Sequence, residues 1–302
     1  MPKYYFSRFE QRTPPEPLHT PPWMMRLWQV LAVAGLVLGA NYIRWRWMES
    51  LNMDALWYAV PLALAETLAW IGTLLFTINI WQVKDPECPP PPDDINQCLL
   101  PQDRGDSRPP KVDLFIATYS EDVELVRLSI QDALKMTYPA EIVYRVHVLD
   151  DGRRPEMRAV CEEEGVNYIT RDNNIGYKAG NIRNGMEHTD GDFLIICDAD
   201  TRVFPTLLTH TLGYFRDPDV AWVQTPQWFF DLPEGERLHA WLKRKAGLPG
   251  YLFGRATEGI FGRLTIGSDP FFNDPRMFYD VILRRRNWAN AAFCCGAASV
   301  HR

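Results

Sequence analysis

Two long apolar runs occupy the first part of the chain. The run from 27 to 43 holds 17 residues without a charge, and the run from 61 to 81 holds 21 residues and a single charge, Glu66. A helix needs ~20 mostly apolar residues to cross a bilayer, and tryptophan and tyrosine gather at its interfaces, as they do around the second run. Within residues 23–82 we therefore expect two transmembrane helices, at about 26–44 and 61–81. The alternative interpretation is a buried helical hairpin in a soluble core.

The distribution of basic residues predicts the orientation of this hairpin. The segment before the first run carries Lys3, Arg8, Arg12 and Arg26, and the connecting loop carries Arg44 and Arg46. Because positive charge is retained on the cytoplasmic side, residues 1–22 and everything after the second helix are expected in the cytoplasm. Glu66 is costly in lipid, so we expect it to pair with another helix or to lie near the outer interface.

A proline-rich segment follows at residues 83–110 and includes four consecutive prolines, Pro89 to Pro92. Such a composition is typical of an extended linker without a packed core of its own. A folded domain is expected to cover residues 111–302.

Beyond Lys111 short apolar runs alternate with helical patterns. The expected strands are 112–118, 142–149, 166–169, 193–197 and 220–224, and the expected helices are 121–136, 154–164, 177–188 and 205–215. This alternation predicts a doubly wound α/β domain with a parallel sheet. Ligands bind beyond the carboxyl ends of the strands in such sheets.

Three of the expected strand ends carry polar residues suited to a nucleotide and a metal. They are Thr118-Tyr119-Ser120-Glu121, Asp150-Asp151-Gly152 and Asp198-Ala199-Asp200. In an extended segment residues i and i+2 face the same way, so Asp198 and Asp200 can present two carboxylates to one Mg²⁺ or Mn²⁺ ion. Such an ion usually takes further ligands from phosphate oxygens, which indicates a nucleotide diphosphate. Lys178, at the start of an expected helix, could reach the phosphate.

Charge and motifs exclude other classes of function. The net charge of −6 disfavours a nucleic-acid surface. The chain lacks the glycine-rich signatures of dinucleotide-binding proteins and of P-loop enzymes. Its six cysteines show no CxxC spacing, which suits neither a tetrahedral metal site nor a disulfide framework and favours a reducing compartment.

The motifs taken together resemble one known family. They are Thr118-Tyr119 with Glu121, Asp150-Asp151-Gly152, Lys178-Ala179-Gly180-Asn181, Asp198-Ala199-Asp200, Gln224-Thr225-Pro226-Gln227 and Cys295-Gly296. In order and spacing they resemble the N-terminal portion of bacterial cellulose synthase catalytic subunits, which are processive family 2 glycosyltransferases. The resemblance implies a nucleotide-diphospho-sugar transferase fold of the GT-A type.

The resemblance also implies roles for particular residues. The UDP-sugar would be bound by Thr118, Tyr119, Glu121, Asp150, Asp151, Lys178, Asp198 and Asp200, with Asp198 and Asp200 as the metal pair and Asp200 in direct contact with the metal. The acceptor glucan would be lined by Gln224, Thr225, Pro226, Gln227, Phe293, Cys295 and Gly296. Three aromatic residues, Trp228, Phe229 and Phe230, could stack on sugar rings or serve only in packing.

The activity implied is that of a membrane-embedded inverting glycosyltransferase. It would transfer glucose from UDP-glucose to a growing β-glucan at a bacterial inner (plasma) membrane, as a multi-pass protein with a cytoplasmic catalytic domain and further synthase subunits. Ser120 and Cys294 depart from the usual cellulose synthase residues, so a curdlan-type or mixed-linkage β-glucan synthase, or a UDP-N-acetylglucosamine donor, remains an alternative.

The general base and acceptor-capping motifs of the family, Thr-Glu-Asp and Gln-x-x-Arg-Trp, are absent from these 302 residues. We therefore expect an incomplete catalytic domain that is inactive alone, or a non-catalytic UDP-sugar-binding membrane fragment. Residues 237–286 mix aromatic, aliphatic and basic side chains, and this pattern predicts an amphipathic segment on the cytoplasmic leaflet; a solvated helix is the alternative.

Overall fold

The computed structural model describes residues 20–83, 87–229, 236–261, 264–266 and 277–302. The chain forms two compact units: Met1–Asp85 with Pro226–Ala292, and Pro86–Thr225 with Phe293–Arg302. The second unit is thus completed by the last ten residues of the chain. Lys3, Arg8, Arg12 and Phe230, which entered the sequence predictions, lie outside the described residues.

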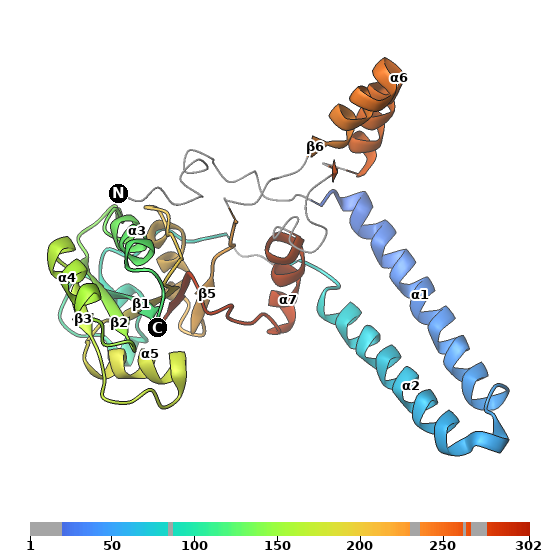
Figure 1. Ribbon diagram of the computed structural model, residues 1–302, viewed down its shortest axis with the longest axis horizontal. Helices are drawn as coiled ribbons and strands as arrows, with labels where there is room; N and C mark the ends of the chain where they lie inside the picture. The colour runs from blue at the N-terminus through green and yellow to red at the C-terminus, as the bar shows by residue number, and fades with distance from the viewer. Residues whose placement is uncertain (1–19, 84–86, 230–235, 262–263, 267–276) are drawn as a thin grey trace. The chain divides into compact units, whose positions relative to one another are not determined.

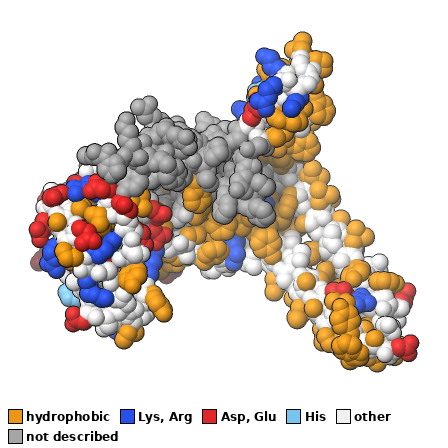
Figure 2. Space-filling model, in the orientation of Figure 1, with side chains coloured by type: hydrophobic (Ala, Val, Ile, Leu, Met, Phe, Trp, Pro, Cys, Tyr) orange, Lys and Arg blue, Asp and Glu red, His pale blue; other side chains and the backbone are white. Residues whose placement is uncertain are grey.

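The first unit contains a helical hairpin. Helix α1 (Pro22–Met48) and helix α2 (Leu56–Asn79) run antiparallel and are joined by a short 3₁₀ turn, η2 (Met53–Ala55) (Figure 1). Their apolar windows have mean hydropathies of 1.5 and 1.7, so both helices are long and apolar enough to cross a membrane. Hydrophobic side chains cover much of their surface in Figure 2. Helix α2 begins at Leu56, before the predicted start at residue 61, and Pro61 lies within the helix.

A polar contact joins the two helices near the hairpin turn. The Arg46 Nε donates to Glu66 Oε2 at 2.8 Å, and the Trp47 Nε1 donates to Thr67 Oγ1 at 2.9 Å. Both partners of the ion pair are partly buried, and the pairing offsets the cost of placing each charge among apolar side chains. Glu66 was expected either to pair with another helix or to lie near the outer interface, and the structure shows the pair with Arg46 of α1.

The rest of the first unit is helical with short strands. It contains β6 (Glu236–Arg237), α6 (Leu238–Phe261), β7 (Thr265–Ile266), the π-helical turn η7 (Met277–Leu283), α7 (Arg284–Arg286) and η8 (Asn287–Ala289). Helix α6 is kinked at Gly247, whose φ of 65° favours glycine. It exposes the apolar side chains of Leu248, Leu252 and Phe253 and the basic side chains of Arg244 and Arg255. Figure 2 shows hydrophobic and basic side chains over this helix, and its contact with a membrane leaflet stays a prediction.

The second unit is an α/β fold with one six-stranded sheet. Its strands are β1 (Lys111–Thr118), β2 (Val143–Asp150), β3 (Asn167–Ile169), β4 (Phe193–Asp198), β5 (Trp222–Gln224) and β8 (Ser299–His301). Its α-helices are α3 (Val123–Ala133), α4 (Pro155–Glu164) and α5 (Tyr177–Glu187). The predicted strands and the first three predicted helices are therefore present. The helices and strands β3 and β5 are shorter than predicted, whereas β1 and β4 are each one residue longer.

The sheet has the order β3-β2-β1-β4-β8-β5. The predicted parallel sheet is wrong in one respect, because β8 pairs antiparallel with both β4 and β5 and makes the sheet mixed. Strand β8 was not predicted: Ser299–His301 is three residues long, too short for a periodicity to register.

The central strand β1 is buried on both faces of the sheet. Val112, Leu114 and Ile116 of β1 belong to the main core, together with α3 and α4 residues such as Val126 and Met157. On the other face α5 approaches so closely that a Cβ at Gly185 would meet the Phe115 and Leu149 side chains at 2.8 and 3.0 Å. Helices thus cover both faces, as in a doubly wound domain.

Two further predictions need correction. Residues 205–215 do not form an α-helix but two 3₁₀ turns, η5 (Leu208–His210) and η6 (Leu212–Arg216), in a segment interrupted by β-branched threonines and Gly213. Residues 87–110, expected to be an extended linker, pack on the α/β unit: Ile95 and Cys98 are buried in its core, and 3₁₀ turns form at Ile95–Gln97 (η3) and Pro101–Asp103 (η4). Buried apolar side chains within the proline-rich segment explain the packing.

Candidate functional site

The predicted site residues meet at one edge of the sheet. Strand pairing places Thr118 beside Asp150, and Ala117 beside Asp198, so three parallel strands end together. Because β8 runs in the opposite direction, its first residue, Ser299, lies beside Gln224 at the same edge. The antiparallel strand therefore brings the segment 293–298 to the carboxyl ends of the other strands, where ligands bind in α/β proteins.

Asp150 is fully buried, and its carboxylate is surrounded by donors. It accepts hydrogen bonds from the backbone N–H of Gly152 at 3.0 Å and of Arg154 at 2.8 Å, from Arg154 Nε at 3.2 Å, and from the Tyr168 hydroxyl at 3.0 Å. Burial, together with this carboxylate, raises the pKa of Tyr168 to about 12, so the hydroxyl stays a donor. Asp150 thus shapes the turn at the end of β2 rather than presenting a free carboxylate.

Asp151 is also buried, and Arg171 engages it at two points. Arg171 Nε donates to Oδ1 at 2.6 Å and Nη2 donates to Oδ2 at 2.7 Å. The hydrogen bond to Asp151 raises the pKa of Arg171 above its ordinary value. The same guanidinium donates to the carbonyls of Ile175 at 2.7 Å and Tyr177 at 2.9 Å, so it also fixes the loop that leads into α5.

Glu121 organises the loop after β1. One of its oxygens accepts from the Thr118 hydroxyl at 2.7 Å and from the backbone N–H groups of Tyr119 at 2.7 Å and Ser120 at 3.1 Å. Partial burial raises the pKa of Glu121, but these hydrogen bonds outweigh it and the net shift is downward. Glu121 is therefore ionised at neutral pH, and the ring of Tyr119, 58% exposed, projects into solvent.

Lys178 links the two sides of the edge. Its ammonium forms an ion pair with Asp198 Oδ1 and donates to the carbonyl oxygen of Gly296 at 2.7 Å. Lys178 is the second residue of α5, Asp198 ends β4, and Gly296 lies in the segment before β8. Both side chains of the ion pair remain partly exposed, so a ligand can reach them.

The two aspartates expected to bind metal differ in their surroundings. Asp198 shares one oxygen with Lys178, whereas Asp200 is exposed and makes no hydrogen bond or ion pair within the described part of the chain. Two carboxylates are a suitable but incomplete donor set for a hard divalent ion. No group of three or more His, Cys, Asp or Glu side chains able to hold a metal is found among the described residues. The pair fits an ion that takes its other ligands from a phosphate and from water.

The residues expected to line an acceptor fall in both units. Gln224 Nε2 donates to the Ala297 carbonyl at 2.9 Å and its Oε1 accepts from the Cys295 N–H at 2.7 Å, while the Thr225 hydroxyl donates to the Ala298 carbonyl at 2.6 Å. Gln224 and Thr225 therefore hold the segment 293–298 in place. Phe293, 43% exposed, lies in the same unit. Pro226 and Gln227, with Trp228 and Phe229, belong to the first unit.

Sequence reasoning missed two arginines that belong to this site. Arg154 Nη2 donates to the Thr118 hydroxyl at 2.8 Å and Nη1 to the Glu121 carbonyl at 2.5 Å, in addition to its contacts with Asp150. Arg171 holds Asp151. A buried carboxylate needs a charged or hydrogen-bonding partner. The adjacent aspartates Asp150 and Asp151 were therefore a signal in the sequence that arginines would pair with them. Which arginine serves which aspartate depends on the fold.

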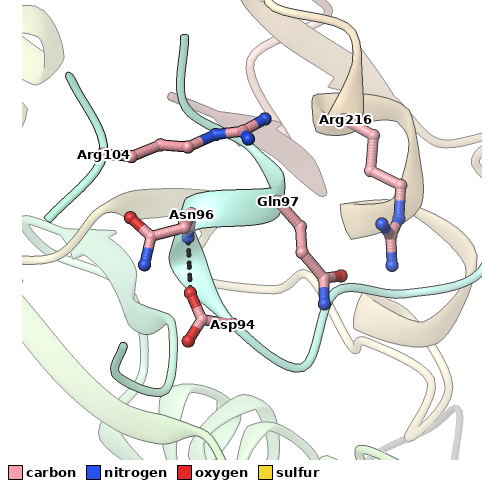
Figure 3. Close-up of a pocket in the computed structure, with 5 residues that line it drawn as sticks. All are labelled: Asp94, Asn96, Gln97, Arg104 and Arg216. Atoms are coloured by element: carbon pink, nitrogen blue, oxygen red, sulfur yellow. Dashed lines mark hydrogen bonds between the residues drawn. The ribbon is translucent and has the colours of Figure 1, made fainter. Parts of the chain in front are cut away.

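A pocket of about 460 Å³ lies elsewhere on the α/β unit (Figure 3). It is lined by Asp94, Asn96, Gln97, Arg104 and Arg216. Asp94 accepts from the Asn96 N–H at 2.7 Å, and Arg216 Nε donates to the Pro90 carbonyl at 2.8 Å. These groups help to hold the segment 87–110 on the domain, and none of the predicted site residues lines the pocket.

Comparison with known proteins shows that the chain is similar to bacterial cellulose synthases. Cellulose synthase 1 of Komagataeibacter xylinus is 31% identical over 272 residues, which are 89% of this chain and 15% of that protein. The cellulose synthase catalytic subunit [UDP-forming] of Pseudomonas fluorescens (strain SBW25) is 30% identical over 285 residues, 90% of this chain and 32% of that protein. The chain therefore spans less than a third of the length of these relatives.

Among solved structures, the chain is similar to the mannosyltransferase PcManGT from Pyrobaculum calidifontis in complex with GDP-Man and Mn2+. The similar region covers 56% of this chain and 47% of the mannosyltransferase chain, with a TM-score of 0.42 and 19% sequence identity. The cellulose synthase relatives confirm the resemblance expected from the motifs. The profile of glycosyl transferase family 2 matches residues 113–298, more than half of the chain. The chain thus belongs to glycosyl transferase family 2, with an α/β domain preceded by a two-helix apolar hairpin.

Proposed function

We propose that this chain is the donor-binding part of a membrane-embedded inverting glycosyltransferase that transfers glucose from UDP-glucose to a growing β-glucan. The observation that carries the proposal is the contact of Lys178 with both Asp198 and Gly296. It joins the carboxylates suited to a metal and a diphosphate to the segment that would line the acceptor. A transferase needs its two substrates within reach of each other, because positioning supplies much of its rate.

The nucleoside would lie over the ends of β1 and β2. Asp151 supplies a carboxylate that Arg171 holds in one orientation, and the loop of Thr118 to Glu121 supplies a rigid wall with the exposed ring of Tyr119. Both carboxylate oxygens of Asp150 accept hydrogen bonds from the turn that follows β2. We therefore propose that Asp150 positions Asp151 and this turn rather than contacting the nucleotide base. Preorganised polar groups of this kind cost little reorganisation when a ligand binds.

The diphosphate would lie between the start of α5 and the end of β4. Lys178 offers a cation that can turn from Asp198 to phosphate oxygens. Asp198 and Asp200 would hold Mg²⁺ or Mn²⁺, and such an ion neutralises the charge that develops on the UDP leaving group. Loss of the proton from the acceptor hydroxyl requires a general base, for which no residue of this chain is proposed.

The membrane part of the proposal rests on α1 and α2. Their length and hydropathy support a transmembrane hairpin, and the amphipathic α6 supports contact with the cytoplasmic leaflet of a bacterial inner membrane. Further synthase subunits and the glucan itself are proposed partners by the resemblance to cellulose synthases. Curdlan-type or mixed-linkage synthesis, and UDP-N-acetylglucosamine as donor, are the alternatives at the same site.

Calorimetric titration of UDP into the purified chain with Mg²⁺ or Mn²⁺ tests the proposal. We expect metal-dependent binding that Asp200→Ala abolishes, whereas Asp219→Ala, which removes an exposed aspartate elsewhere on the same unit, leaves binding unchanged. Competition among UDP-glucose, UDP-N-acetylglucosamine and GDP-mannose then identifies the donor. Unchanged UDP affinity in Asp200→Ala would contradict the site.

A further inference from the structure

Three polar side chains around the start of β8 form a cluster that the proposed transfer reaction does not use. The Cys294 sulfur lies 3.4 Å from Ser299 Oγ and 3.7 Å from His301 Nε2, and Ser299 Oγ lies 2.9 Å from the same nitrogen. Ser299 is fully buried, whereas Cys294 and His301 are partly exposed. Thiol, hydroxyl and imidazole therefore form a continuous chain of hydrogen-bonding groups.

The hydrogen bonds of this chain run from the thiol through the hydroxyl to the imidazole. Cys294 donates to Ser299, and with the imidazole proton on Nδ1 the Ser299 hydroxyl donates to His301 Nε2. The backbone N–H of Gly296 donates to the Cys294 sulfur at 3.3 Å, a contact that stabilises negative charge there. Burial lowers the pKa of His301, so its imidazole is neutral at pH 7 and Nε2 can accept the hydrogen bond from Ser299.

We infer that Cys294 is an activated thiol, with Ser299 and His301 as its proton relay, and that it is a site of oxidation by peroxides. The thiol proton passes to Ser299 Oγ while the serine proton passes to His301 Nε2. The thiolate then attacks one oxygen of hydrogen peroxide, an S–O bond forms, and the O–O bond breaks. The departing hydroxide takes the proton from His301 and leaves as water. Sulfur is oxidised by two electrons to a sulfenic acid, and the peroxide is reduced by the same two.

Oxidation at this sulfur reaches the donor side through one residue. Gly296 donates its N–H to Cys294 and accepts from Lys178 through its carbonyl. An oxygen added to the sulfur disturbs the first contact and shifts the glycine that holds Lys178. This consequence for UDP binding rests on the proposed function, whereas the reactivity of the thiol does not.

Two other cysteines of the same unit serve as internal references. Cys88 is exposed, its sulfur contacts the carbonyls of Pro89 and His210, and burial of part of the side chain raises its pKa. Cys295 is the sequence neighbour of Cys294 and is exposed to a similar degree. Exposure alone therefore predicts that Cys88 reacts fastest, and the relay predicts that Cys294 does.

Treatment of the purified full chain with hydrogen peroxide at pH 7, trapping of sulfenic acid with dimedone and tandem mass spectrometry give a rate for each cysteine. We expect Cys294 to react ~10-fold faster than Cys88 and Cys295, and Ser299→Ala or His301→Gln to remove this advantage. A Cys294 rate no higher than that of Cys88 overturns the inference, and so does a wild-type rate in folded His301→Gln. If a variant does not fold, the rates within the wild-type chain decide.

UDP titration before and after oxidation gives the second readout. Oxidised wild-type protein is expected to bind UDP more weakly, whereas Cys294→Ser is expected to keep its own affinity after the same treatment. Equal loss in both proteins overturns the coupling through Gly296. Absence of UDP binding in the reduced wild-type protein contradicts the proposed function instead, and the labelling rates still decide whether Cys294 is activated.

Discussion

Arg171 and Asp151 face each other in a two-point ion pair, with Nε to Oδ1 at 2.6 Å and Nη2 to Oδ2 at 2.7 Å. Both side chains are more than nine-tenths buried. The arginine also donates to the carbonyls of Ile175, in the loop before α5, and of Tyr177, the first residue of α5. A single guanidinium therefore joins the end of β2 to the start of the helix that carries Lys178.

Replacement of this arginine is expected to damage both stability and ligand binding. Arg171→Ala leaves the buried Asp151 carboxylate without its partner, which costs ~3 kcal/mol of unfolding free energy. Chemical denaturation measures this loss, and UDP titration is expected to show binding weakened by ~10-fold or more because the loop and the carboxylate lose their positions.

Two variants control for this result. Arg171→Lys keeps the charge but loses the planar fork, so we expect it to recover only part of the stability. Asp151→Asn combined with Arg171→Ala is expected to be more stable than Arg171→Ala alone, because no buried charge is left unpaired. Wild-type stability in Arg171→Ala would show that the ion pair does not hold this loop.

Gly180 is expected to tolerate no side chain. A Cβ there would lie 2.0 Å from the Ile175 carbonyl oxygen and 2.6 Å from Arg171 Nη1. Gly180→Ala must therefore move the loop or the arginine, and we expect a loss of ~1–3 kcal/mol in unfolding free energy.

The matched control is Gly259→Ala in α6, where a Cβ meets nothing within 4 Å. Alanine at such a helical position is expected to be neutral or to stabilise by ~0.4–1 kcal/mol. Equal effects of the two substitutions on the melting temperature would count against the close packing around Gly180.

Glu121 predicts a pH dependence of stability. Its pKa in the folded protein lies below the ordinary value of 4.5, because hydrogen bonds from Tyr119, Thr118 and Ser120 outweigh partial burial. The ionised carboxylate therefore stabilises the fold fully above pH 4.5, and this stabilisation is lost as the pH falls through the folded-state pKa. We expect Glu121→Gln to melt at a lower temperature than wild type at pH 7 and the difference to shrink as the pH falls below 4.5.

Thermal melts of both proteins between pH 7 and pH 3 measure this difference. Glu141→Gln is the control, since Glu141 is exposed and makes no hydrogen bond or ion pair within the described residues. It is expected to leave the melting temperature unchanged. A Glu121→Gln difference that stays constant over the whole range would exclude the carboxylate as its origin.

The orientation of the hairpin can be tested with cysteine labelling. The positive-inside bias predicts that the turn between α1 and α2 faces away from the cytoplasm and that the α/β unit faces the cytoplasm. Met53, 72% exposed in this turn, is a suitable position for Met53→Cys. In intact spheroplasts a membrane-impermeant maleimide is expected to label this cysteine, whereas the native exposed Cys88 becomes labelled only after permeabilisation. The reverse pattern would invert the proposed topology.

The order of elements and the chemistry at their ends could be predicted from the sequence, because both are local properties. Apolar periodicity marks β1, β2 and β4, and polar residues follow each of them. The resemblance to cellulose synthases then assigned these strand ends to a nucleotide-sugar site. The family match covers these residues, and their roles stay a prediction. Ile95 and Cys98 show the limit of composition, since a proline-rich segment contributes two buried side chains to the core.

The sequence by itself determined which residues follow each strand and where two helices are apolar enough to cross a membrane. Only the tertiary structure decided that β8 runs antiparallel and so carries Gly296 to Lys178, and that Arg154 and Arg171 occupy Asp150 and Asp151 while Asp200 stays open. The physical reason is that strand direction and the pairing of charges depend on residues far apart in the chain. The partner of a buried carboxylate is chosen by the fold, because an unpaired buried charge is too costly to persist.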